Sequence, residues 1–196
     1  MPPPVPLSRR RIGQAALDLI DERGFHALTM RAVGEQLEVK PPSLYNHVRG
    51  KDEIVLAVVE LLAERIDLST LGGTDLTAAL TAFARSYREA FTGHHEVVGL
   101  LARQPVQARG ALQMYETFMR RMADHGLDAA RSVEVLAAVE TVVIGSVLLT
   151  FHAGLRDADA AIAPRLASGL AQQGAELDDR AFEMALAGVV ERALAP

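Results

Sequence analysis

Apolar residues recur at helical spacing along nearly the whole chain, and this periodicity limits the possible folds more than any other feature. Near the N-terminus, a stripe one helical turn apart is formed by Ile12, Ala15, Ala16, Leu19 and Ile20. No segment has the alternation of apolar and polar residues that is typical of a half-buried strand. The sequence therefore predicts an all-α fold.

Capping and stop residues divide this pattern into helices. Ser8 is a candidate N-cap and Gly24 a candidate stop for the first helix. A short helix should follow Thr29, and another should cover 43–48 and bury Leu44 and Val48. The longer helices are expected over 52–68, 75–93, 95–103, 106–125, 128–154, 157–173 and 178–194. Because 133–155 is apolar on nearly every face, we expect it to be buried by its own domain and by a second subunit.

The charge is divided unevenly. The net charge of the 196 residues is −5, which argues against a generic nucleic-acid binder, but residues 1–51 carry +3 and the remainder −8. There is no cysteine, so disulfides and thiolate sites are excluded. The longest apolar stretch, 142–151, is about half of the ~20 residues that span a bilayer. We expect a cytoplasmic protein that does not enter a membrane.

Two short helices that follow a longer one form a helix-turn-helix pattern. We therefore predict a disordered proline-rich arm over 1–7, a three-helix DNA-binding domain over 8–51, and a helical domain over 52–196. A major groove admits one helix, whose N-terminal residues reach base edges. Asn46 could pair with adenine, Ser43 with a base or phosphate, and Pro42 with a thymine methyl. Alternatively, Asn46 could be a solvated surface residue.

The sequence of this segment resembles the DNA-binding domain of the tetracycline-repressor (TetR) family. The resemblance lies in Gly24-Phe25, Leu28-Thr29, Val33, Leu37 and the run PSLYNHV over 42–48 before Lys51. The stretch SYREAFTGHHEVVGLLARQP over 86–105 resembles the start of the family's ligand-binding half. The resemblance implies a homodimer that binds a palindromic double-stranded DNA operator and is released by a small molecule. Activation in place of repression remains open.

Contacts to DNA follow from the resemblance as well as from the groove geometry. The predicted DNA-binding residues are Thr29, Arg31, Lys40, Pro42, Ser43, Tyr45, Asn46, His47 and Lys51. The resemblance assigns phosphate contacts to Tyr45, His47 and Lys51, although Tyr45 could pack in the core. The run Arg9-Arg10-Arg11 could add contacts to DNA or be only a solvated charge run. Glu38 departs from the family pattern, which has a glycine in a left-handed backbone conformation at this turn.

The effector is not identified by the sequence. Candidate ligand-binding residues are Tyr87, Phe91, Arg103, Gln107, Met114, Phe118, Glu140 and His152, although each could instead belong to the core. In the founding tetracycline repressors a histidine before the proline that matches Pro105 helps bind a magnesium chelate, and Leu100 stands there in this chain. A tetracycline–magnesium effector is therefore not expected, and neither is a cofactor.

The dimer interface is expected on the helices 128–154 and 178–194, through Val142, Leu149, Phe182, Leu186 and Val190. These residues could alternatively fill the core of the single chain. A different class of function, a metal sensor, could use His94, His95, Glu96, His125 and His152. Adjacent histidines diverge on a helix, so the pair at 94 and 95 is a poor chelator. No motif of a nucleophile elbow, P-loop or dinucleotide site is present, so we expect no enzyme.

Overall fold

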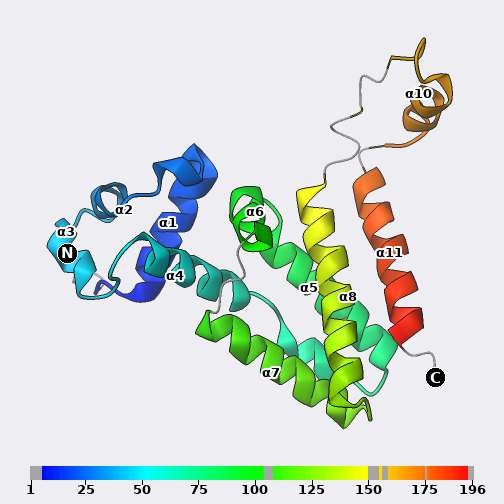
Figure 1. Cartoon of the computed structure of the whole chain (residues 1–196), viewed down its shortest axis with the longest axis horizontal. Coiled ribbons are helices and arrows are strands. Elements are labelled where there is room, and N and C mark those ends of the chain that lie inside the picture. The colour runs from blue at the N-terminus through cyan, green and yellow to red at the C-terminus, as the bar shows by residue number, and fades with distance from the viewer. Residues whose placement is uncertain (1–5, 104–107, 150–154, 156–158, 175, 194–196) are drawn as a thin grey trace, which may run out of the picture. The chain divides into compact units, whose positions relative to one another are not determined.

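The computed structural model describes residues 6–103, 108–149, 155, 159–174 and 176–193, and these residues form helices without a strand (Figure 1). The elements are α1 (Arg9–Arg23), η1 (Phe25–Ala27), α2 (Met30–Gln36), α3 (Pro41–Tyr45), α4 (Lys51–Ala63), η2 (Leu68–Gly72), α5 (Leu76–Phe91), α6 (His95–Arg103), α7 (Arg109–Asp124), α8 (Ala129–Leu148), α10 (Pro164–Ala171) and α11 (Leu177–Ala193). The all-α prediction is confirmed.

The chain divides into two compact units. The first contains residues 1–68 and 89–118, and the second contains residues 69–88 and 119–196. The first unit thus includes α4 as well as the three helices that precede it. The second is built mainly from α8 and α11, which pack against each other.

Helix α1 begins and ends where the sequence predicts. The Ser8 hydroxyl accepts a hydrogen bond from the Arg11 amide at 3.2 Å, and Gly24 ends the helix with φ 80°. The predicted apolar stripe is buried. α1 packs against α4, and a Cβ atom added to Gly13 would lie 2.7 Å from the Ala57 carbonyl oxygen. This close approach requires a glycine.

The two short helices differ slightly from their predicted bounds. α3 begins at Pro41, two residues before the predicted start, and ends at Tyr45, because proline is well suited to a first helical turn, where its missing N–H costs nothing. Leu44 and Val48 are buried as predicted, with 0% and 1% of their surface exposed. α4 ends at Ala63, five residues earlier than predicted.

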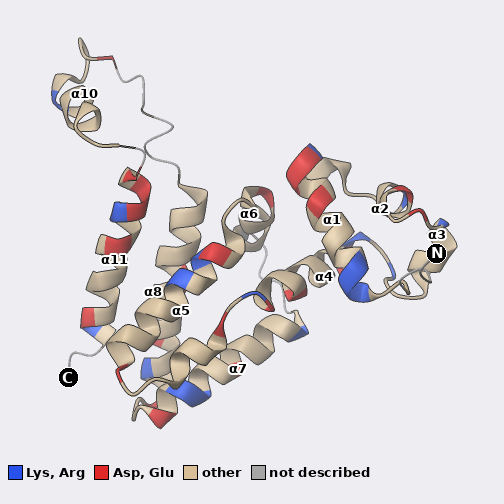
Figure 2. Cartoon of the chain, turned by 180° about the vertical axis from the view of Figure 1, so that it is seen from behind, with Lys and Arg blue, Asp and Glu red and all other residues tan. Residues whose placement is uncertain are grey.

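Helix α8 buries one face and leaves another exposed. The buried residues of α8 include Val135, Val139, Val143 and Val147, and the helix packs against α11. Charged residues are sparse along it (Figure 2). Val133 and Leu149, however, are 55% and 69% exposed. The chain alone therefore does not bury this helix on all sides. The helix ends at Leu148, and the rest of its predicted range, 150–154, lies outside the described residues.

The predicted helix over 157–173 is shorter in the structure. α10 covers Pro164–Ala171 and has no buried residue, whereas residues 159–163 form a turn and 156–158 lie outside the described residues. Among the described helices, none has both the length and the apolar composition needed to cross a membrane.

Candidate nucleic-acid interface and effector site

Helix α3 has a buried side and an exposed side. Leu44 and Val48 anchor the segment in the core, while Tyr45 is 56% exposed and Asn46 and His47 are exposed. Lys40 and Pro42 at the start of the helix are also exposed, and Ser43 is half-buried. The alternative that Tyr45 packs in the core is wrong. The segment thus presents an aromatic hydroxyl, an amide and an imidazole to whatever lies against α3.

The turn before α3 has the strained backbone expected from the sequence. Glu38 has φ 55°, in the left-handed region that favours glycine. The Val39 amide donates to the Gly34 carbonyl oxygen at 2.9 Å and closes the turn. A Cβ atom on Gly34 would lie 3.1 Å from the Val39 carbonyl oxygen. Gly34 thus stands at the position where α2 approaches the turn closely, whereas Glu38 stands at the position with the left-handed backbone.

Two predicted contact residues at the start of α2 have local partners. The Thr29 hydroxyl accepts a hydrogen bond from the Ala32 amide at 3.0 Å and caps the helix. Arg31 donates through Nε to Glu35 Oε1 at 2.8 Å, and this hydrogen bond raises the pKa of the Arg31 guanidinium. Both residues are exposed. They remain accessible to a phosphate, but Arg31 carries its own counter-charge.

Lys51, at the first residue of α4, is fixed by η1. Its Nζ donates to the Phe25 carbonyl oxygen at 3.3 Å and lies 4.1 Å from the centroid of the Phe25 ring. The side chain is half-buried. Sequence reasoning gave Lys51 a phosphate contact and did not foresee this contact with Phe25.

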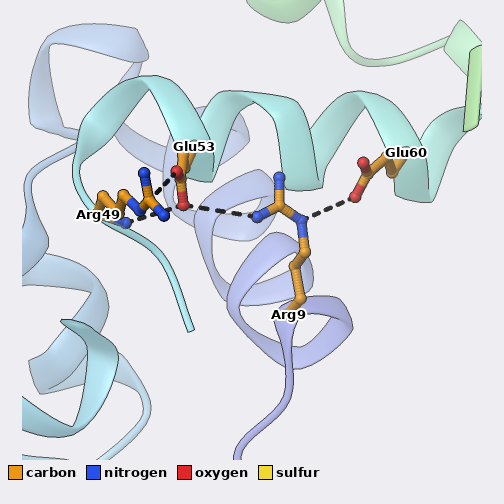
Figure 3. A network of polar contacts seen from close by, with 4 residues as sticks. All are labelled: Arg9, Arg49, Glu53 and Glu60. Carbon is orange, nitrogen blue, oxygen red and sulfur yellow. Dashed lines mark hydrogen bonds and ion pairs between the residues drawn. The ribbon is translucent and has the colours of Figure 1, made fainter. Parts of the chain in front are cut away.

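The arginine run at the start of α1 is tied to α4. Arg9 Nε donates to Glu60 Oε2 at 2.9 Å, and Arg9 Nη1 lies 3.7 Å from Glu53 Oε2 (Figure 3). Glu53 also accepts a hydrogen bond from the Arg49 amide at 2.9 Å. Arg10 pairs with Glu64 on the same face of α4. Arg9 and Arg10 are therefore not merely solvated charges.

His94 joins three parts of the first unit. Its Nδ1 lies 2.8 Å from Asp21 Oδ2 on α1, and its Nε2 lies 3.1 Å from Nη1 of Arg65, which follows α4. His95, in contrast, is exposed. No three histidine or carboxylate side chains come together as a metal site in the described part of the chain, and His152 lies outside that part.

Two predicted effector residues meet in the second unit. The Tyr87 hydroxyl donates to Glu140 Oε1 at 2.8 Å, and Tyr87 is only 5% exposed. The Phe83 ring meets the Tyr87 ring edge-on, with centroids 5.9 Å apart. Phe91, Met114 and Phe118 are buried in the first unit. The side chain of Arg103 and the residues Gln107 and His152 lie outside the described residues.

Family models match both parts of the chain. Residues 12–58 match the model described as bacterial regulatory proteins of the tetR family, and residues 70–195 match the tetracyclin repressor-like C-terminal domain. The chain belongs to the TetR family of transcriptional regulators. Its helix-turn-helix is α2 with α3.

Two individual relatives support the membership of this chain in the TetR family. It is 31% identical over 191 residues to the class A tetracycline repressor protein from transposon 1721 of Escherichia coli, which covers 91% of this chain and 86% of that protein. It is 28% identical over 141 residues to an HTH-type transcriptional regulator of Saccharopolyspora erythraea, but the match spans 72% of this chain and only 60% of the relative's length.

The fold of this TetR-family chain is also found in solved structures. A TetR variant from Acinetobacter baumannii in complex with minocycline superposes with a TM-score of 0.71. The two chains are 28% identical, and the match covers 95% of this chain and 92% of the other.

The predicted dimer residues of this TetR-family chain fall into two groups. Phe182, Leu186 and Val190 are 3%, 1% and 2% exposed because α11 packs on α8, so they have almost no surface left for a second chain. Their placement agrees with the alternative that they fill the core of the single chain. Val142 is half-buried and Leu149 is exposed, so these two can still contact a partner.

Proposed function

We propose that this TetR-family chain is a repressor that binds a palindromic DNA operator as a homodimer and leaves it when a small molecule binds. The proposal rests on the burial pattern of α3 and the residues that follow it. Leu44 and Val48 lie in the core, whereas Tyr45, Asn46 and His47 are exposed. A short helix held in this way fits the major groove.

Base contacts and phosphate contacts have different roles in this proposal. Asn46 offers a donor and an acceptor to adenine, Ser43 a hydroxyl to a base or phosphate, and Pro42 an apolar contact to a thymine methyl. Lys40, at the start of α3, can also reach a base edge. Phosphate contacts come from the exposed or half-buried polar side chains of Thr29, Arg31, Tyr45, His47 and Lys51. The base contacts determine which DNA sequence is recognised, whereas the phosphate contacts fix the register of the protein on the duplex.

Internal ion pairs weaken the electrostatic part of binding. Arg9 and Arg10 pair with carboxylates of α4, and Arg31 pairs with Glu35. Each pair reduces the positive potential that the first unit presents to phosphates. We therefore infer weak non-specific binding, so that specificity rests on two half-sites read by the two subunits. The acidic remainder of the chain adds to this effect, and the expected location is the bacterial cytoplasm.

The effector site is proposed around Tyr87 and Glu140. The Tyr87 hydroxyl on α5 donates a hydrogen bond to the Glu140 carboxylate on α8, and most of the buried residues of these two helices are apolar. An effector can form hydrogen bonds with these two groups while its apolar surface is buried. A small molecule with both apolar surface and a hydrogen-bonding group fits this setting. The second subunit is proposed to lie against α8 at Val142 and Leu149.

The test begins with selection of DNA from a random pool by the full chain. We expect enrichment of an inverted repeat, and analytical ultracentrifugation of the complex should give two chains per operator. A thermal-shift screen then identifies effectors, since a ligand that binds the folded state raises the melting temperature with concentration. Each hit should release the selected operator, and Tyr87→Phe should weaken its effect. Enrichment of no sequence, or one chain per site, would contradict the proposal.

A further inference from the structure

A groove of about 600 Å³ lies in the first unit between α4 and the start of α7. Its apolar wall includes Ile66, Leu68 and Met114, and its charged rim includes Glu60 and Arg109. A volume of this size is in the range of sites for small organic molecules, which is roughly 300–1,000 Å³. The groove is therefore large enough to hold a ligand of its own.

The charges along the rim are paired except at one place. Glu60 is paired with Arg9 at 2.9 Å, and Glu64 is paired with Arg10. Arg109 is exposed, and in the part of the chain that the structure describes no carboxylate lies within ion-pair distance of it. The rim thus carries one uncompensated positive charge beside an apolar wall.

We propose that this groove binds an amphipathic organic anion, such as a medium-chain carboxylate. The acid group pairs with the Arg109 guanidinium, whose planar set of N–H donors matches a carboxylate. The apolar chain lies along Leu68, which is half-buried, and beside the small exposed surfaces of Ile66 and Met114. An anion is favoured over a cation because both carboxylates of the rim already have arginine partners.

This groove is a different site from the Tyr87–Glu140 pair. Tyr87 and Glu140 belong to the second unit, whereas every residue that lines the groove belongs to the first. The groove also borders the Arg9–Glu60 ion pair that fixes the start of α1 on α4. A ligand here contacts the ion pair that joins α1 to α4, the two helices on either side of the helix-turn-helix in the sequence, so it can act on the same unit.

The experiment measures binding of decanoate to the full chain by isothermal titration calorimetry and by thermal shift, below the micellar range and without DNA. Decyltrimethylammonium, with the same chain and the opposite charge, is the ligand control. Arg109→Ala should weaken decanoate binding by roughly tenfold, since it removes one charge-assisted hydrogen-bonded pair. Arg121→Ala is the matched control, because it removes an exposed arginine of the same helix that does not line the groove.

A second variant, Gly110→Leu, fills the groove without removing a charge. Gly110 lines the groove, and a Cβ atom added to it would lie 3.4 Å from Glu60 Cγ, an ordinary contact. Both groove variants should keep the circular dichroism spectrum of the wild type and bind decanoate more weakly.

The proposal is overturned if decanoate does not bind the wild type, if decyltrimethylammonium binds equally well, or if Arg109→Ala and Arg121→Ala bind alike. It is also overturned if Tyr87→Phe, and not Arg109→Ala, abolishes binding. Because no DNA is present, failure here leaves the proposed operator binding untouched.

Discussion

The ammonium of Lys51 lies 4.1 Å from the centroid of the Phe25 ring and donates to the Phe25 carbonyl oxygen at 3.3 Å. This pair connects the first residue of α4 to η1, the turn that follows α1. The side chain proposed to bind a phosphate is thus fixed before DNA arrives. Preorganisation of this kind lowers the conformational entropy that Lys51 loses on binding.

Replacing the two partners should separate their roles. Lys51→Met should weaken binding to all DNA sequences, and the slope of log affinity against log salt should fall in magnitude by about 0.9, the value for one phosphate contact. Phe25→Leu removes the ring below the ammonium, so the free energy of unfolding should fall by roughly 0.5–1 kcal/mol or more, with the salt slope unchanged. Fluorescence anisotropy across a salt series measures the slopes. An unchanged slope in Lys51→Met would limit Lys51 to a positioning role.

Asn46→Ala should relax the sequence preference at one base position of each half-site. The loss of discrimination should be about 1–3 kcal/mol there, with the other positions of the site serving as the internal control. The melting temperature should stay as in the wild type, because Asn46 is exposed. Competition binding with single-base operator variants measures this. An unchanged preference at every position would remove Asn46 from base recognition.

Glu38→Gly should stabilise the protein. Glu38 has φ 55°, and relief of a left-handed backbone at a residue with a Cβ atom is worth about 1 kcal/mol. Glu38→Ala keeps the Cβ atom and is the matched control, with little change expected. Urea unfolding of the three proteins measures the free energies. Equal stability of the glycine and alanine variants would show that the turn is not strained.

Gly13→Ala should destabilise the first unit. The added Cβ atom would lie 2.7 Å from the Ala57 carbonyl oxygen, so α1 and α4 must move apart at a cost of about 1–3 kcal/mol. Gly188→Ala on α11 is the control, since no atom lies within 4 Å of its Cβ position, and it should gain roughly 0.5–1 kcal/mol from helix propensity. The two shifts in the melting temperature should have opposite signs.

The Glu183–Arg85 pair predicts a pH dependence. Arg85 donates to both carboxylate oxygens at 2.8 and 2.7 Å, which lowers the pKa of Glu183 below its usual 4.5. A lowered pKa in the folded state stabilises the protein above pH 4.5, and this stabilisation disappears as the pH falls through the folded value. Glu183→Gln should therefore be less stable than the wild type at pH 7, and the difference should vanish in acid.

Glu191→Gln, an exposed glutamate on the same helix with no ion pair among the described residues, is the control for this measurement. Its stability should follow that of the wild type at every pH. A constant difference between Glu183→Gln and the wild type down to pH 3 would contradict the assignment to the carboxylate. Thermal unfolding across the pH series decides between these outcomes.

Local patterns were sufficient for the helices and for the outward side of α3. The spacing of Ile12 to Ile20 specified the buried face of α1, because helical periodicity alone decides which side chains share a face. The left-handed backbone at Glu38 was predicted from the resemblance to the TetR family, which has a glycine at this turn. The ends of α4 and α8 differ from the predicted ends, since the last turn of a helix depends on packing more than on propensity.

The tertiary structure alone decided which distant residues meet. Arg9 and Glu60 are fifty-one positions apart, and nothing near either residue indicates the other. The same holds for Tyr87 with Glu140 and for Lys51 with Phe25. The apolar residues of α11, such as Phe182, fit a dimer interface and a monomer core equally well, and only the packing of the folded chain, with α11 against α8, shows that Phe182 is covered. Periodicity determines which face of a helix is apolar, but the partner of that face is chosen by the packing of the whole chain.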